Sequence, residues 1–181
     1  MTISNWRRTA GWIGCAAGVV GVIAGLLTIL WPDQVDTDTT GFTVLQSVLA
    51  VRDVGLAILL TTLWPAKRAR AIWVAGAVAG MLVLAALEII TIFSRHDNGA
   101  AYGLTSYAIG LCLILGAIRP VRRLPLALGI YVFVPMTPAI MAGFVLEQLV
   151  IAGWMAGFAL LGWRSVAPAQ RADSLVQGER A

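Results

Sequence analysis

The chain has 181 residues, of which 59% are hydrophobic and 12% are charged, whereas soluble domains are about 45–50% apolar and about 25% charged. This composition excludes an ordinary soluble enzyme and indicates an integral membrane protein with a single domain. The formal net charge of +4 does not indicate a nucleic-acid partner, because the basic residues lie in short groups at the ends of apolar stretches and not in one patch.

The first four apolar stretches predict the orientation of the chain. Residues 11–31 form a stretch too long for the apolar part of a signal peptide, which has about 7–15 residues, so we expect it to stay in the mature protein. The loop after it is acidic and has no basic residue, which indicates the external side. Residues 42–64 lead into a basic loop at residues 65–70, which returns the chain to the cytoplasm by the positive-inside rule. Two further spans are expected at residues 71–93 and 101–118, followed by a second basic loop.

The next apolar stretch is harder to divide. Residues 124–163 carry one charge, and they are too long for one span of about 20 residues and barely long enough for two. Pro135 and Pro138 interrupt this stretch, and proline disfavours helix at its own position and at the residue before it. We therefore expect a short helix at residues 124–134 and a long helix at residues 138–163.

The expected fold is an all-α transmembrane bundle of six helical segments, five of them full spans and one a short or re-entrant helix. Residues 1–164 would form the single transmembrane domain, and the polar residues 165–181 a disordered cytoplasmic tail. Both termini would then lie on the cytoplasmic side of the inner (plasma) membrane. The alternative is five spans, with residues 124–134 re-entrant and the C-terminus outside.

Four glycines of the first span repeat at GxxxG spacing. Gly14, Gly18, Gly21 and Gly25 lie along one face of a helix, where a second helix can approach closely. The second helix can belong to the same chain or to another copy, so intramolecular packing and a homodimer both remain open.

Metal and cofactor sites are not expected. The two cysteines, Cys15 and Cys112, fall inside apolar stretches, and the chain has one histidine, His96. The usual ligand sets of zinc and haem sites are therefore missing. We expect no metal and no cofactor.

Two charged residues lie at the centre of the second span. Arg52 and Asp53 would each cost about 2.5–3.5 kcal/mol there if left unpaired, so they should face protein or water. Neighbours on a helix point about 100° apart. We therefore expect Asp53 to share a polar stripe with Gln46 and Arg52 to reach another helix.

Two glutamates lie on later spans. With the expected topology, Glu88 and Glu147 fall in the outer half of the bilayer together with Gln46. Because polar side chains of a small bundle turn inward, we expect a polar cavity that opens outward and is floored by Arg52 and Asp53. The candidate acid/base residues are Asp53, Glu88 and Glu147. The candidate ligand-binding residues are Gln46, Arg52, Gln148, Tyr102, Tyr107 and Trp154.

This set of residues favours proton-transfer chemistry on a lipophilic substrate. An arginine can keep one acid ionised while a second acid stays protonated, which provides a base and an acid for isomerisation, epoxide opening or cyclisation. We therefore expect binding of a lipophilic small molecule or a membrane lipid, with carboxylate catalysis as a hypothesis. Three alternatives remain open: an ion pair that only holds helices in register, an accessory subunit of a larger membrane complex, and a proton-coupled carrier.

The second span also carries a family resemblance. Residues 51–57, in which Arg52 and Asp53 are followed by Gly55, come after an acidic loop and a glycine-rich first span. This arrangement resembles small DoxX-like multi-pass membrane proteins, over about residues 1–118. The resemblance implies a small helical bundle in which Arg52 and Asp53 are residues of interest.

Overall fold

The computed structural model contains helices joined by short loops. It describes the backbone of residues 3–32, 36, 39–64, 68–96, 98–118 and 122–178, and the side chains within these ranges except those of residues 3–4, 68–70 and 167–178. The helices are α1 (Ile3–Leu30), α2 (Thr40–Leu60) with the 3-10 turn η2 (Thr61–Leu63), α3 (Arg68–Ser94), α4 (Gly99–Ala117), α5 (Arg123–Tyr131), the π turn η3 (Val132–Met136), α6 (Thr137–Ala142) and α7 (Phe144–Gly178).

Six continuous helical stretches are long and apolar enough to cross a membrane. Within the described residues they are Asn5–Leu30, Thr40–Leu63, Ala71–Ser94, Gly99–Ala117, Arg123–Ala142 and Phe144–Val166. The predicted all-α bundle with six helical segments is therefore confirmed.

The division of the fifth and sixth stretches differs from the prediction. The elements α5, η3 and α6 join into one stretch of 20 residues, so the expected short or re-entrant helix is long enough to span. Pro135 lies in the π turn and Pro138 in the first turn of α6, where a widened turn or a missing N–H makes proline tolerable. The break falls at Gly143, whose φ of 116° is a conformation that glycine adopts without strain.

The last helix is also longer than predicted. It begins at Phe144 and continues past residue 164 to Gly178, through much of the stretch for which the sequence predicted a disordered tail. Residues 179–181 lie outside the described residues.

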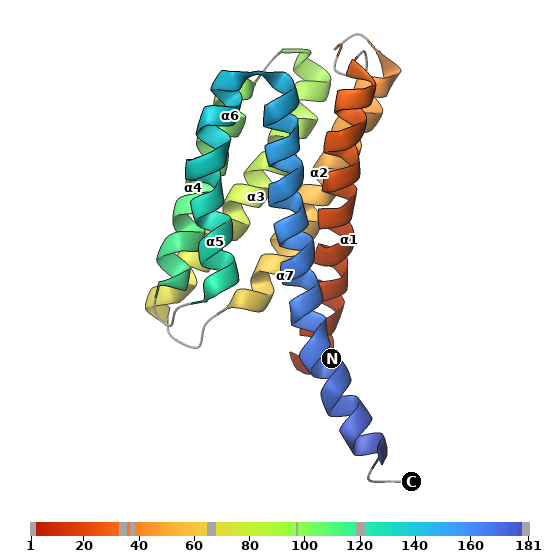
Figure 1. Cartoon of the computed structure of the whole chain (residues 1–181), viewed down its shortest axis with the longest axis vertical. Helices are drawn as coiled ribbons and strands as arrows, with labels where there is room; N and C mark the ends of the chain where they lie inside the picture. The colour runs from red at the N-terminus through yellow and green to blue at the C-terminus, as the bar shows by residue number, and fades with distance from the viewer. Residues whose placement is uncertain are drawn as a thin grey trace.

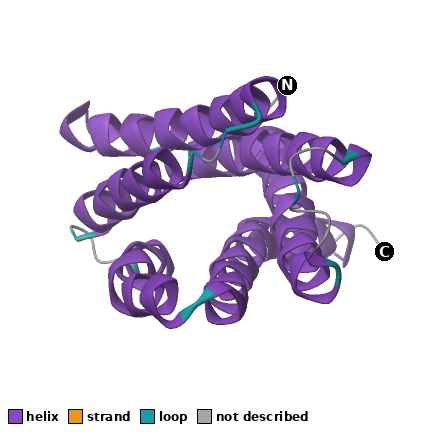
Figure 2. Cartoon of the chain, turned by 90° about the horizontal axis from the view of Figure 1, so that it is seen from above, coloured by secondary structure: helices purple, strands orange, loops and turns teal. Residues whose placement is uncertain are grey.

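The six long helical stretches run in alternating directions along the bundle, with α5 and α6 together forming one of them (Figure 1). With six alternating stretches, the start of α1 and the end of α7 lie at the same end of the bundle, as the six-segment interpretation requires. Seen from above, the helices form a ring (Figure 2), in which α1 packs on α2, α2 on α3, α3 on α4, α4 on α5, α5 on α7, and α7 on α1. The first and last helices therefore close the bundle.

Three glycines of the α1 stripe, Gly18, Gly21 and Gly25, form this closure, whereas Gly14 faces Leu59 of α2. A Cβ atom added at Gly18 would lie 2.5 Å from the backbone nitrogen of Ala159 on α7, and one at Gly21 would lie 2.6 Å from Cγ of Met155. On the opposite side, a Cβ at Gly162 of α7 would lie 2.5 Å from the backbone nitrogen of Cys15. Of the two alternatives for these glycines, the structure shows intramolecular packing.

Candidate functional site

Arg52 and Asp53 form a buried ion pair in the middle of α2. Arg52 is 9% exposed and Asp53 is 0% exposed, and Nε of Arg52 donates a hydrogen bond to Oδ1 of Asp53 at 2.8 Å. Although neighbouring residues on a helix point about 100° apart, the long arginine side chain crosses this angle and returns to its own helix.

The other end of the same guanidinium points to α3. Nη2 of Arg52 lies 3.9 Å from Oε1 of Glu88, a residue that is 5% exposed. The prediction that Arg52 reaches another helix is therefore confirmed. Gly21 of α1 makes room for the arginine, since a Cβ there would lie 3.0 Å from Cδ of Arg52.

A chain of hydrogen bonds continues from Glu88 along the interface of α3 and α4. The hydroxyl of Tyr102 donates to Oε2 of Glu88 at 2.8 Å and lies 3.2 Å from the hydroxyl of Thr91. Nδ2 of Asn98 donates to the same Thr91 hydroxyl at 2.8 Å. Since Asn98 precedes the first residue of α4, the chain connects the bundle interior to the loop between α3 and α4.

Two buried oxygens near this group accept no hydrogen bond from the described residues. They are Oδ2 of Asp53 and Oε1 of Gln46. The two residues are seven positions apart on α2, or two helical turns and a rise of about 10.5 Å, so they lie on one face as predicted. A buried oxygen without a donor is costly, and each of these two could accept a hydrogen bond from a ligand or a water molecule.

The third predicted acid, Glu147, is not part of this group. Glu147 lies in the first turn of α7 and is half-buried. The residue of α7 at the depth of Arg52 is Met155, because both contact the position of a Cβ added at Gly21. Eight residues separate Glu147 from Met155, a rise of about 12 Å along the helix. The structure therefore brings Glu88 to Arg52 but does not bring Glu147 there.

The remaining predicted ligand residues have other contacts. The hydroxyl of Tyr107 lies 2.7 Å from the hydroxyl of Thr137 on α6. Trp154 is buried, and its Nε1 donates to the carbonyl oxygen of Leu128 at 3.0 Å. Gln148 is half-buried on α7. Its backbone carbonyl oxygen would lie 3.4 Å from a Cβ atom added at Gly25 of α1. Tyr107 and Trp154 thus connect α4 to α6 and α7 to α5.

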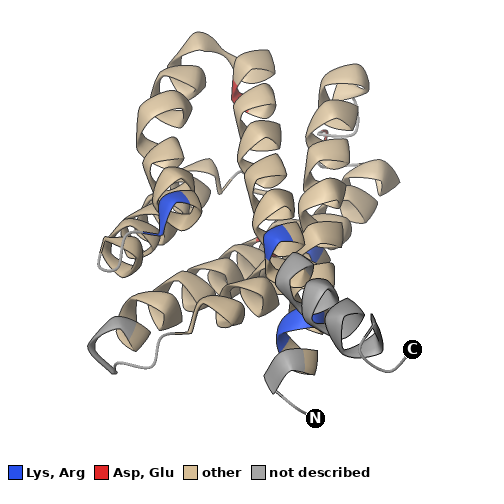
Figure 3. Cartoon of the chain, turned by 60° about the horizontal axis from the view of Figure 1, so that its bottom comes forward, with Lys and Arg blue, Asp and Glu red and all other residues tan. Residues whose placement is uncertain are grey.

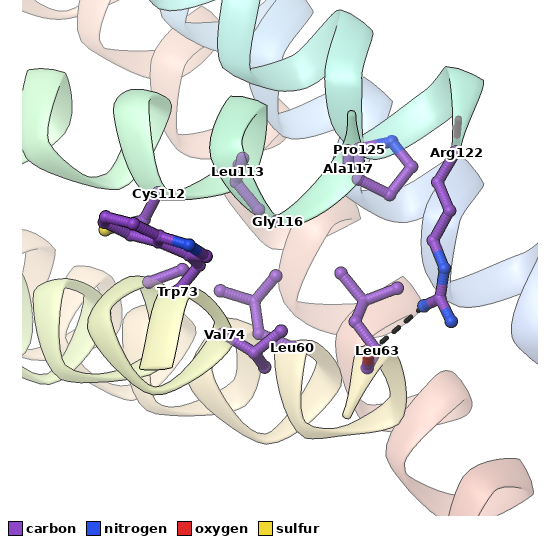
Figure 4. A pocket seen from close by; sticks show the side chains of 11 residues that line it. Leu60, Leu63, Trp73, Val74, Cys112, Leu113, Gly116, Ala117, Arg122 and Pro125 are labelled. Carbon is purple, nitrogen blue, oxygen red and sulfur yellow. Dashed lines mark hydrogen bonds between the residues drawn. The ribbon is translucent and has the colours of Figure 1, made fainter. Parts of the chain in front are cut away.

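Two hollows in the described part of the chain are lined by residues other than Arg52, Asp53 and the glutamates. One is a small apolar hollow of about 20 Å³ at the end of the bundle that holds the termini, with Trp73 and Arg122 at its border (Figure 4). The other is a shallow apolar surface hollow beside the turn at Gly143. The predicted outward cavity floored by Arg52 and Asp53 is not one of these two.

Sequence reasoning missed two members of the hydrogen-bonded chain. Thr91 is three residues after Glu88, which places both on one face of α3, and this spacing could have identified it. Asn98 could have been recognised as a polar residue directly before a helix start. Among the described residues, groups of three or more His, Cys, Asp or Glu side chains able to hold a metal ion are absent.

Comparison of the chain with family models, curated proteins and solved structures gives no match. The resemblance to DoxX-like proteins therefore stays a prediction, and the functional argument depends on the geometry of the buried residues.

Proposed function

We propose that this protein binds a lipophilic small molecule or a lipid inside the membrane and carries out acid/base chemistry on it at Asp53 and Glu88. The observation that supports this proposal is the buried group of one arginine and two carboxyl groups, joined by contacts of 2.8 and 3.9 Å. Ionisable residues within membrane spans are costly and are typical of functional sites.

The charges of this group support an acid and a base in one place. One guanidinium balances one carboxylate, and an unbalanced charge is strongly disfavoured in a medium of low dielectric constant. The electroneutral state of Arg52, Asp53 and Glu88 therefore has one carboxylate and one carboxylic acid, which share a single proton. The carboxylate can take a proton from a substrate while the acid gives one to it, so the total number of protons on the site is unchanged.

The hydroxyl groups of Tyr102 and Thr91 give Glu88 a route for proton exchange with one side of the membrane. They lead toward Asn98 at the loop between α3 and α4. In the opposite direction, α2 and α3 contribute buried apolar side chains, including Leu56 and Met81. Access from one side suits an enzyme or a binding protein better than a proton-coupled carrier, which needs access from both sides.

The free oxygen of Asp53 suits a ligand that carries a hydrogen-bond donor. Oδ2 is buried and accepts no bond from the described residues, so a ligand hydroxyl there would satisfy it. Isomerisation, epoxide opening and cyclisation of such a molecule all need one proton donor and one acceptor. We place this chemistry in the outer half of the plasma membrane, with both termini in the cytoplasm, because the arginine-bearing starts of α3 and α5 lie at the end of the bundle that holds the termini.

The proposal is tested by purifying the protein from membranes and identifying bound lipophilic compounds by mass spectrometry. The wild type and the control Glu147→Gln should carry the same enriched compound, and Asp53→Asn should lower its amount by about tenfold. In deuterated water, the wild type should exchange carbon-bound hydrogen of the compound, and Glu88→Gln should bind the compound without exchange. The absence of an enriched compound on folded wild type, or equal exchange by Glu88→Gln, would contradict the proposal.

A second candidate is a non-catalytic subunit of a membrane complex or of a homodimer. It is favoured by the closed contact between Arg52 and Asp53 and by the two hollows being lined by other residues. In that case the ion pair would only hold α2 against α3. All the variants above would then carry the same compounds as the wild type.

A further inference from the structure

The small hollow at the end of the bundle that holds the termini is bordered by features that suit a lipid. It lies where the end of α2, the start of α3, the end of α4 and the start of α5 meet, and its lining is almost entirely apolar (Figure 4). Trp73, 36% exposed, forms part of its wall, and tryptophan prefers the headgroup region of a bilayer. The hollow, with a volume of about 20 Å³, fits part of a single hydrocarbon chain.

An arginine is fixed at the mouth of this hollow. Nη1 of Arg122 donates a hydrogen bond to the carbonyl oxygen of Leu63 at 3.1 Å, so the guanidinium bridges the end of η2 and the start of α5. A guanidinium has five N–H donors, and this bond uses one of them. Arg122 is exposed, so the donors that face outward can bind an anion.

The surroundings of Arg122 add positive charge. Arg123, the next residue, is also exposed, and it begins α5, which has no side-chain cap. The N–H groups of an uncapped first turn carry partial positive charge. In Figure 3 the basic residues at the start of α5 are separated from those nearer the two termini, so they form a group of their own.

We propose that this end of the protein binds an anionic phospholipid of the adjacent leaflet. Its phosphate contacts the guanidinium groups of Arg122 and Arg123, and one acyl chain lies along the hollow beside Trp73. Charge complementarity identifies the headgroup class, since basic pockets between transmembrane helices bind anionic headgroups, and arginine binds phosphate through paired hydrogen bonds. This site lies at the other end of α2 from Gln46 and does not depend on the acid/base proposal.

The lipid site is tested by measuring lipid binding to the full chain in detergent micelles. Native mass spectrometry with added phosphatidylglycerol should show a bound lipid, and phosphatidylcholine should bind about tenfold more weakly. Arg122→Gln should weaken phosphatidylglycerol binding by about tenfold or more, the effect of losing charged hydrogen bonds. Arg164→Gln removes an exposed charge from α7 and should leave binding unchanged.

Two further variants separate the headgroup from the chain. Arg123→Gln lowers the charge without removing the bond to Leu63, so it tests the headgroup even if Arg122→Gln does not fold. A Cβ at Gly116 would be in ordinary contact with Trp73, at 3.5 Å, so Gly116→Leu should fold, fill the hollow and lower lipid affinity.

Three results would overturn the lipid site. The first is equal binding of the two lipids, and the second is equal lipid affinity of Arg123→Gln and Arg164→Gln. The third is that inorganic phosphate displaces the lipid from the wild type and from Gly116→Leu at the same phosphate concentration. The last result would mean that the site binds an anion without using the hollow.

Discussion

Replacing Arg52 with methionine tests whether the buried charges hold the bundle together. Methionine has a similar length and no charge, so the substitution leaves little empty volume but removes the guanidinium that contacts Asp53 at 2.8 Å and Glu88 at 3.9 Å. Breaking a buried pair by removing one partner costs about 3–5 kcal/mol, because the other charge stays buried without compensation. We expect a loss of this size in the free energy of unfolding.

The contacts of the two acids predict an order among single substitutions. Asp53→Asn keeps an oxygen that can accept the hydrogen bond from Nε of Arg52, so we expect a smaller loss, about 1–3 kcal/mol. Glu88→Gln keeps an acceptor for Tyr102 and loses only the longer ion contact, so about 1 kcal/mol or less is expected. The double variant Arg52→Met with Asp53→Leu removes both partners of the short pair, and it should be more stable than Arg52→Met alone.

These free energies can be measured by reversible unfolding in mixed micelles with an increasing fraction of sodium dodecyl sulfate, followed by circular dichroism. Wild type and all four variants are compared under one set of conditions. A loss below about 1 kcal/mol for Arg52→Met, or a double variant no more stable than the single variant, would refute the reasoning.

Four further outcomes follow from individual contacts. Tyr102→Phe removes the hydroxyl that donates to the buried glutamate and should lower the unfolding free energy by about 1–2 kcal/mol in the same micelle assay. Gly18→Ala places a methyl group against the backbone of α7 and should cost about 1–3 kcal/mol, whereas Gly103→Ala, with nothing within 4 Å of the added atom, should be neutral or stabilising. Gly143→Ala imposes a φ of 116° on a residue with a side chain and should lower the melting temperature, at a cost of about 1–3 kcal/mol. A cysteine introduced at Ser94 should react in intact cells with a thiol reagent that does not cross membranes, and labelling only after cell lysis would reverse the proposed orientation.

The number and limits of the first four spans could be predicted from the sequence because charge and apolar length determine them directly. The fifth and sixth spans could not, because the effect of a proline depends on the turn that contains it. Pro135 is accommodated in a π turn, which no pattern in the sequence indicates. Gly143 was the better signal, since a glycine directly after a helix often ends it.

The sequence predicted that Arg52 has an acidic partner but not which acid it is. The cost of a buried charge requires that Arg52 finds a partner, and two acids, Glu88 and Glu147, lay at similar predicted depth. Which of them it meets depends on the order of helices around the ring, and α2 packs on α3 but has α1 between it and α7. Depth can be read from hydropathy, whereas ring order depends on side-chain packing between helices and is not visible in a single sequence.

The ring order also explains how such a small bundle can hold charges at its centre. The closure between α1 and α7 depends on glycines and close backbone contacts, which need no polar group, whereas α2, α3 and α4 are joined by the hydrogen bonds and ion contacts around Arg52. The two kinds of contact meet at Gly21, whose missing side chain leaves space for both Met155 and the stem of Arg52. The guanidinium can therefore lie inside the ring and reach two acids. A larger residue at Gly21 would force it outward, toward lipid, where no acid is available to balance it.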